Sequence, residues 1–158
     1  MAYHEPEHAK NVAQWSRREG VIAIGWGLTG DLRQQQFRDK KELTRLVIQS
    51  HPMLSIRRCA NSGPSLWNLY REMHIGDLVI LNTNGRSLTM RITGNYYFIA
   101  GEHPPYYEHR RKAEAVPIDP NRLWQVSGGG AQGEGIYSSL IRCANTLNEA
   151  EFEALIAG

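Results

Sequence analysis

Apolar and polar positions along the chain follow patterns that predict a small set of strands. Residues 21–24 (VIAI) form an apolar, largely β-branched run between glycines, which predicts a buried first strand. Residues 78–81 (LVIL) predict a second buried strand, and the Asn84-Gly85 pair after it favours a tight hairpin. We expect a return strand through Leu88, Met90 and Ile92, a turn at 93–95, and further strands at 96–99, 112–116 and 136–143.

The helical spacing of apolar residues predicts helices on both sides of these strands. Asp39 is placed to cap a helix over residues 40–49, and another helix is expected to begin near Ser62 with Pro64 in its first turn. The apolar stripe of that second helix consists of Leu66, Leu69, Tyr70 and Met73. A short helix is expected around residues 12–17, next to a polar lead-in over residues 1–14.

The order of these elements predicts one α+β domain over residues 1–158. A strand, two helices and a meander of antiparallel strands suit a small mixed, mainly antiparallel β-barrel with flanking helices. Asp119-Pro120-Asn121 is expected to form a turn, and residues 127–135 a glycine-rich loop. A capping-box pattern at 146–149 opens a C-terminal helix over 146–158, which either completes the domain or begins a linker.

Composition narrows the class of protein. A chain of 158 residues can bury a core, and 41% hydrophobic with 22% charged residues is typical of soluble globular proteins. No apolar run approaches the ~18–20 residues that a membrane span needs, and the N-terminus is polar rather than signal-like. We therefore expect a cytoplasmic protein with no membrane partner.

The charge pattern is compatible with a nucleic-acid partner but does not establish one. The formal net charge is only +2. Arginine supplies 14 of the 18 basic residues, with pairs at 17–18, 57–58 and 110–111, and its planar guanidinium suits phosphate. Ordinary surface arginines beside acidic residues explain the same pattern equally well.

The sequence gives little support for catalysis or for a cofactor. Cys59 and Cys143 lack the spacing of metal ligands. His4 and His8 are four residues apart in HEPEH, which matches the HExxH spacing, but they lie in the polar lead-in and not on an expected helix. Residues 128–135 lack the GK[ST] ending of a phosphate-binding loop, and there is no GxSxG nucleophile motif. We expect no metal, no cofactor and no enzymatic activity, with acid–base chemistry by carboxylates distant in sequence as an open alternative.

Aromatic residues beside glycine-containing turns are the most informative feature. Trp26 follows the first strand and stands between Gly25 and Gly27, and Tyr96 follows the turn expected at 93–95. Two such rings at one barrel mouth would hold a planar base, and stacking on a ring contributes roughly 1–3 kcal/mol per base. The alternative is that Trp26 closes one end of the barrel, and Trp67 either covers the barrel or lines the pocket.

Four segments in succession carry a family resemblance. GVIAIGWGLTGDL, SLWNLYREMHIGDLVIL, MRITGNYYF and EHRRKAEAV together resemble the EVE/PUA-like, YTH-related domain at the N-terminus of Mrr-type and McrB-type modification-dependent restriction proteins. The resemblance spans about residues 15–142. Relatives usually have a valine and a tryptophan where Ala113 and Ala115 stand here, and many continue into a nuclease or ATPase domain that these 158 residues do not include.

The resemblance implies a DNA-binding module that takes a methylated or hydroxymethylated base out of the duplex by base flipping. Trp26 would form the pocket wall, helped by Tyr96 or Trp67, while Asp31 and Asn61 would contact the polar edge of the base. The YxY and HxR pairs of the family fall on Tyr96 and Phe98, and on His109 and Arg111. The phosphate contacts would come from Arg33, Arg57, Arg58, Arg110 and Arg111. The expected partners are DNA with a modified base and a nuclease or ATPase effector of a restriction defence system.

Two other functions fit a barrel of this kind. One is an RNA-binding PUA-like module, which comparison of affinities for modified DNA, unmodified DNA and structured RNA would distinguish. The other is an ASCH-like amidohydrolase that acts on a modified nucleoside. That enzyme would need a lysine or carboxylate inside the pocket, and none of the four lysines stands beside the aromatic turns: Lys10, Lys40, Lys41 and Lys112.

Overall fold

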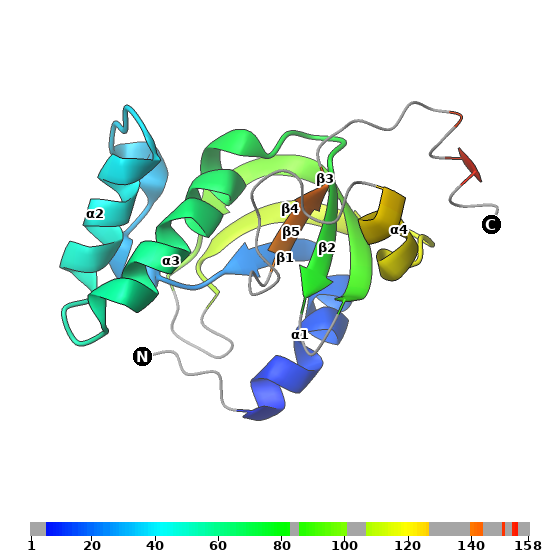
Figure 1. Cartoon of the computed structure of the whole chain (residues 1–158), viewed down its shortest axis with the longest axis horizontal. Coiled ribbons are helices and arrows are strands. Elements are labelled where there is room, and N and C mark those ends of the chain that lie inside the picture. The colour runs from blue at the N-terminus through cyan, green and yellow to red at the C-terminus, as the bar shows by residue number, and fades with distance from the viewer. Residues whose placement is uncertain are drawn as a thin grey trace.

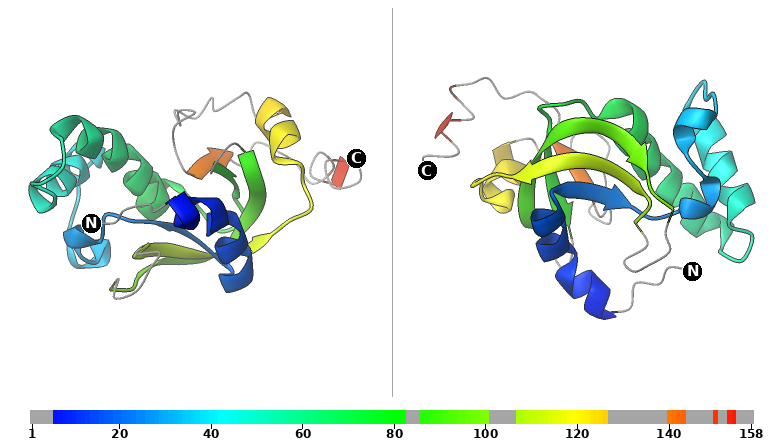
Figure 2. Two further views of the ribbon diagram at one scale, coloured as in Figure 1. Left: turned by 90° about the horizontal axis from the view of Figure 1, so that it is seen from below. Right: turned by 180° about the vertical axis from the view of Figure 1, so that it is seen from behind.

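A curled antiparallel sheet forms the centre of the chain, with helices packed against it (Figure 1). The computed structural model describes residues 6–82, 86–100, 107–126, 140–143, 150 and 153–154. Its strands, in the sheet order β1-β4-β3-β2-β5, are β1 (Val21–Ile24), β4 (His109–Ala115), β3 (Arg86–Phe98), β2 (Leu78–Asn82) and β5 (Leu140–Cys143). Every pairing is antiparallel, and β3 and β4 are long and curved (Figure 2).

The helices are distributed around the sheet rather than stacked on one side. Helices α2 and α3 lie together at one end, and α4 lies toward the opposite end (Figure 1). Their bounds are α1 (Pro6–Glu19), α2 (Lys40–Ser50), α3 (Ile56–Trp67) and α4 (Pro120–Val126). Shorter helical turns are η1 (Gly27–Thr29), η2 (Leu32–Gln34) and the π-helical η3 (Asn68–Glu72). None of the described helices is long and apolar enough to cross a membrane.

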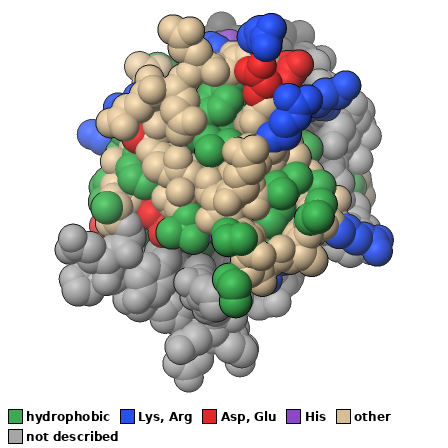
Figure 3. All heavy atoms as spheres, turned by 90° about the vertical axis from the view of Figure 1, so that its left-hand side faces the viewer, with side chains coloured by type: hydrophobic (Ala, Val, Ile, Leu, Met, Phe, Trp, Pro, Cys, Tyr) green, Lys and Arg blue, Asp and Glu red, His purple; other side chains and the backbone are tan. Residues whose placement is uncertain are grey.

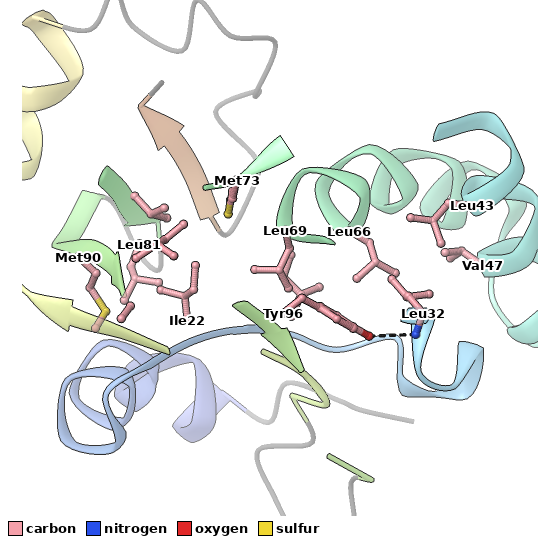
Figure 4. Close-up of a cluster of buried hydrophobic side chains, with 14 of the residues drawn as sticks. Ile22, Leu32, Leu43, Val47, Leu66, Leu69, Met73, Leu81, Met90 and Tyr96 are labelled. Carbon is pink, nitrogen blue, oxygen red and sulfur yellow. Dashed lines mark hydrogen bonds between the residues drawn. The ribbon is translucent and has the colours of Figure 1, made fainter. Parts of the chain in front are cut away.

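The core lies between the concave side of the sheet and the α2–α3 pair. Leu43 and Val47 of α2 and Leu66 of α3 extend a continuous apolar cluster that includes Ile22 of β1 and Met90 of β3 (Figure 4). A second cluster on the other face of β2 joins Leu78 and Ile80 to Ile118 and Leu123 of the α4 region. Both faces of β2 are therefore buried, which explains why its sequence is apolar without alternation.

Several predicted elements are confirmed. The strand at 21–24 is β1, the strand at 78–81 is the body of β2, and the helix at 40–49 is α2. The Asp39 side chain accepts a hydrogen bond from the Glu42 backbone N–H at 3.0 Å, which is the expected cap. The coarse fold class, an α+β domain with an antiparallel sheet, is also confirmed.

The predicted turn at 93–95 is wrong, because β3 runs without interruption to Phe98. A Cβ built on Gly94 would lie 3.0 Å from the Cβ of Lys112 on β4. Gly94 therefore permits a close approach of two strands, and the register between them shifts between Ile92 and Tyr96.

Other predicted boundaries also need correction. Helix α3 begins at Ile56 rather than near Ser62, because the Ser55 hydroxyl caps it by accepting from the Arg58 N–H at 3.2 Å. The turn expected at 119–121 is instead the start of α4, since proline is well suited to a first helical turn. Helix α1 is longer than residues 12–17, and β4 begins at His109, where it pairs with Ile24. The Asn84-Gly85 turn, the glycine-rich loop, residues 136–139 and most of the C-terminal helix lie outside the described residues.

Candidate functional site

The turn that follows β1 contains an unusual backbone conformation. Trp26 has φ 69° and ψ 36°, and it is the one non-glycine residue with positive φ in the described part of the chain. The left-handed conformation costs an L-residue about 1–2 kcal/mol, because its Cβ crowds the backbone. Interactions elsewhere must therefore hold this turn in place.

A buried histidine supplies those interactions from β4. His109 is fully buried, and its Nε2 lies 3.1 Å from the Trp26 carbonyl oxygen and 3.0 Å from the Thr29 hydroxyl. Its Nδ1 lies 2.7 Å from the Tyr96 hydroxyl. The same hydroxyl accepts a hydrogen bond from the Leu32 N–H at 3.2 Å, drawn as the dashed line in Figure 4.

One protonation pattern satisfies this whole network. Because the Tyr96 oxygen accepts from Leu32, its own proton is free to be donated to His109 Nδ1. Nε2 then carries the ring proton and donates toward the Trp26 carbonyl and Thr29. Burial lowers the pKa of His109 to about 4 and raises the pKa of Tyr96, so both groups are neutral at physiological pH.

The indole of Trp26 is only partly buried and lies between this turn and the α2–α3 connection. Its inner side packs against the core cluster. The His51 ring meets it edge-on at 5.0 Å between centroids, and the guanidinium carbon of Arg58 lies 5.9 Å from the ring centroid. His51 is itself fixed, because its Nδ1 lies 2.9 Å from the Val47 carbonyl oxygen.

The surface next to Trp26 combines apolar and cationic side chains. Leu28, Met53 and Ile56 are 72%, 88% and 70% exposed, and Arg57 and Arg58 are exposed on the first turn of α3. Figure 3 shows this end of the molecule, with hydrophobic side chains scattered over the face and basic side chains at its edge. Exposed apolar groups beside arginines are typical of a binding surface.

The structure brings some of the predicted site residues together. Trp26 and Arg58 are in contact, and Asn61 is exposed three residues further along α3, on the same helical face as Arg58. Asn61 stands inside α3, not in a segment before the helix as expected. Trp67 lies at the far end of α3, where its Nε1 donates to Glu72 Oε1 at 3.0 Å.

Asp31 and Arg33 are paired with each other. The Asp31 carboxylate caps η2 and accepts from the Arg33 guanidinium at 2.6 Å, and this hydrogen bond lowers the pKa of Asp31. A base amine would compete with Arg33 for that carboxylate. Arg110 is half-buried, donates to the Tyr107 carbonyl at 2.7 Å and lies over Trp15 at 5.1 Å.

Two predicted site residues lie inside the protein, which requires a correction. Tyr96 is 6% exposed, with its ring edge against Tyr70 and its hydroxyl committed to the network above. Arg111 is 5% exposed and donates to the carbonyls of Leu69, Tyr70 and Gly94. Tyr96 is therefore not placed to form a second pocket wall, and Arg111 is not placed to contact phosphate. The reason is that residues 109, 111 and 113 of β4 alternate into the core, and Tyr96 of β3 is paired with Arg111 on the same face.

Of the residues around the turn, Tyr96 was a predicted pocket residue, but His109 and His51 were not predicted to form the pocket or to contact phosphate. His109 entered only as part of the HxR pair of the resemblance, and His51 stood in no motif. The spacing of His109 and Arg111 does place both on one strand face, which is the pattern that points inward here.

Comparison with known proteins assigns the chain to a family without a described function. The described residues contain no group of three histidine, cysteine or acidic side chains arranged to hold a metal ion. No curated protein and no solved structure matches the chain. Residues 2–116 match the model of Domain of unknown function (DUF8426), so the chain belongs to this family.

Proposed function

We propose that the chain binds nucleic acid and holds one extruded, modified base against Trp26. The observation that carries this proposal is how the Trp26 indole is exposed and held in place. It is partly exposed, fixed in a left-handed backbone conformation by His109, and faced by the Arg58 guanidinium. A strained aromatic residue that is held this firmly at a surface is a candidate for ligand contact.

Stacking is the interaction that this arrangement favours. A guanidinium and a nucleobase are both planar. A base would therefore stack on the ring beside the Arg58 guanidinium or in its place. Base stacking on an aromatic ring contributes roughly 1–3 kcal/mol without requiring a particular sequence. Arg57 and Arg58 are exposed next to the ring, where they would contact phosphates and make binding weaken with salt.

The curled sheet with helices around it supports an EVE/PUA-like domain as the identity of the fold. In this proposal the chain is the recognition module of a restriction defence system. Cleavage would then be carried out by a nuclease or ATPase partner, and this chain would not act as an enzyme. DNA that carries a modified base is the proposed ligand, and binding to RNA is an outcome that the same experiment detects.

Replacing Trp26 by alanine tests the proposal directly. Fluorescence anisotropy would measure affinity for a panel of short duplexes that differ in one central base: cytosine, 5-methylcytosine, 5-hydroxymethylcytosine, adenine or N6-methyladenine. We expect the wild type to prefer one modified base. W26A should lose about 5- to 150-fold in affinity for that duplex, the equivalent of one stacking interaction, and most of its preference.

Two further variants make the result specific. W26F keeps an aromatic ring and should retain part of the preference. I75A removes an apolar side chain that is 57% exposed between η3 and β2, outside the surface described next to Trp26, and should behave as wild type. A W26A protein that is folded by circular dichroism and binds with unchanged selectivity would refute the proposal, as would tighter binding of structured RNA than of any duplex.

A further inference from the structure

A carboxyl group lies against the turn that presents Trp26. Glu108 immediately precedes β4, and its backbone carbonyl accepts from the Ile99 N–H at 2.9 Å. A Cβ built on Gly27 would lie 2.3 Å from the Glu108 carboxyl carbon and 2.6 Å from its Oε1. Only glycine therefore leaves room for this carboxyl group against the backbone that follows Trp26.

One oxygen of this carboxyl group is buried without a described partner. Backbone N–H groups of Glu108 itself and of Gly27 act on the carboxyl group in the direction that lowers its pKa. Oε2, in contrast, is buried and receives no hydrogen bond from any residue in the described part of the chain. Burial raises the pKa of Glu108, which means that the charged form is disfavoured where it lies.

The buried carboxyl group of Glu108 therefore lowers the stability of the fold at neutral pH. A buried acceptor without a donor loses its hydration and gains nothing in exchange. A raised carboxyl pKa stabilises the fold only at low pH, and that contribution is lost as the pH rises. Groups that are kept at such a cost in a native protein are candidates for a functional contact.

We infer that Glu108 is the specificity-determining group of the site: it accepts a hydrogen bond from the exocyclic amine of the base that stacks on Trp26. This inference rests on the proposed function and adds the class of base. Asp31, the other carboxylate near the turn, is occupied by the guanidinium of Arg33. Cytosine and adenine present an amine donor, and 5-methyl, 5-hydroxymethyl and N6-methyl derivatives all keep at least one N–H.

Matched bases separate this contact from stacking. Cytosine has an amine at C4 and an acceptor at N3, uracil has a carbonyl at C4 and an N–H at N3, and both stack. Each would be placed opposite an abasic site in the same short duplex, so that neither loses a base pair when it leaves the helix. We expect the wild type to bind the cytosine duplex about 10- to 150-fold more tightly, as a hydrogen bond to a charged group allows.

The decisive variant is E108Q, which keeps the shape of the side chain and gives it an N–H donor. We expect E108Q to lose the preference for cytosine or to favour uracil, with overall stacking retained. E114Q changes an exposed glutamate within β4 and should bind as wild type. E108Q should melt no lower than wild type at about pH 8, since a buried charge has been removed.

The outcomes distinguish this inference from the proposed function. If E108Q keeps the cytosine preference while W26A abolishes binding, the proposed function stands and the role of Glu108 is refuted. If W26A has no effect, the proposed function fails, and the assignment of Glu108 fails with it. Loss of the preference in D31N, with E108Q unchanged, would assign the contact to Asp31 and overturn the inference.

Discussion

At the scale of single residues, a neutral polar network determines where Trp26 stands. The left-handed conformation of Trp26 is unfavourable by itself, and the Trp26 carbonyl is held by the imidazole of His109. That imidazole is in turn oriented by the Tyr96 hydroxyl. The network needs a neutral ring, because a proton on Nδ1 would displace the proton that Tyr96 donates there.

This requirement predicts a loss of stability in mild acid. The pKa of His109 is lowered from 6.5 to about 4, so between these values the unfolded chain binds a proton that the folded chain does not. The free energy of unfolding should therefore fall as the pH drops from about 6.5 to 4, by at most about 1.4 kcal/mol per pH unit. Urea unfolding at a series of pH values would measure this decrease in the free energy of unfolding.

The comparison with H109Q isolates the contribution of His109. Glutamine does not titrate, so the difference between the two curves removes the contributions of other groups. Among these, Glu108 has a raised pKa and acts with the opposite sign, while the lowered pKa of Asp31 acts at more acidic pH. Curves of equal slope for H109Q and wild type between about pH 6.5 and 4 would show that His109 does not contribute.

At the scale of elements, the close packing of α2 on α3 positions two neighbours of Trp26. His51 ends α2 and Arg58 lies in the first turn of α3. The two helices are in close contact at Gly63, where a Cβ would lie 2.1 Å from Thr44 Oγ1 and 2.9 Å from Thr44 Cα. The glycine therefore serves the contact between the helices, although it lowers the helical propensity of α3.

Replacing Gly63 by alanine should destabilise the fold despite the better helix propensity. Alanine favours a helix by about 1 kcal/mol over glycine, but here its methyl group would force the backbones of α2 and α3 apart. Overpacking of this kind typically costs about 1–3 kcal/mol, so the free energy of unfolding should fall in chemical denaturation.

A double-mutant cycle tests the proposed cause. In a T44G background the opposing side chain is gone, and G63A should cost much less than it does in the wild type. Equal costs in both backgrounds would show that the contact with Thr44 is not responsible.

At the scale of the whole molecule, the sequence pattern predicted those elements that depend on residues close together in the chain. The apolar runs of β1 and β2 and the Asp39 cap of α2 are read from neighbouring residues, and all three are confirmed. Gly94 has the local appearance of a turn residue, but its role is to admit Lys112 of the adjacent strand. Contacts of this kind join residues that are distant in sequence, so the pattern alone does not predict them.

The candidate site, too, was predicted only where it depends on residues close together in the chain. The position of Trp26 at the end of a buried strand could be predicted from the glycines around it. The network that holds it joins Trp26 to His109, 83 residues away, and only the folded sheet brings them together. Tyr96 was expected at the surface because a turn was expected before it; in a continuous β3 it faces inward.

The central claim is that a base stacks on Trp26. Fluorine NMR of protein labelled with 5-fluorotryptophan would give signals for the four tryptophans, assigned by single phenylalanine replacements. The measurement is a titration with the duplex that binds most tightly. We predict that the Trp26 signal shifts strongly under the ring current of the stacked base, while Trp15, Trp67 and Trp124 shift little. A saturated complex in which the Trp26 signal has not moved would contradict the account.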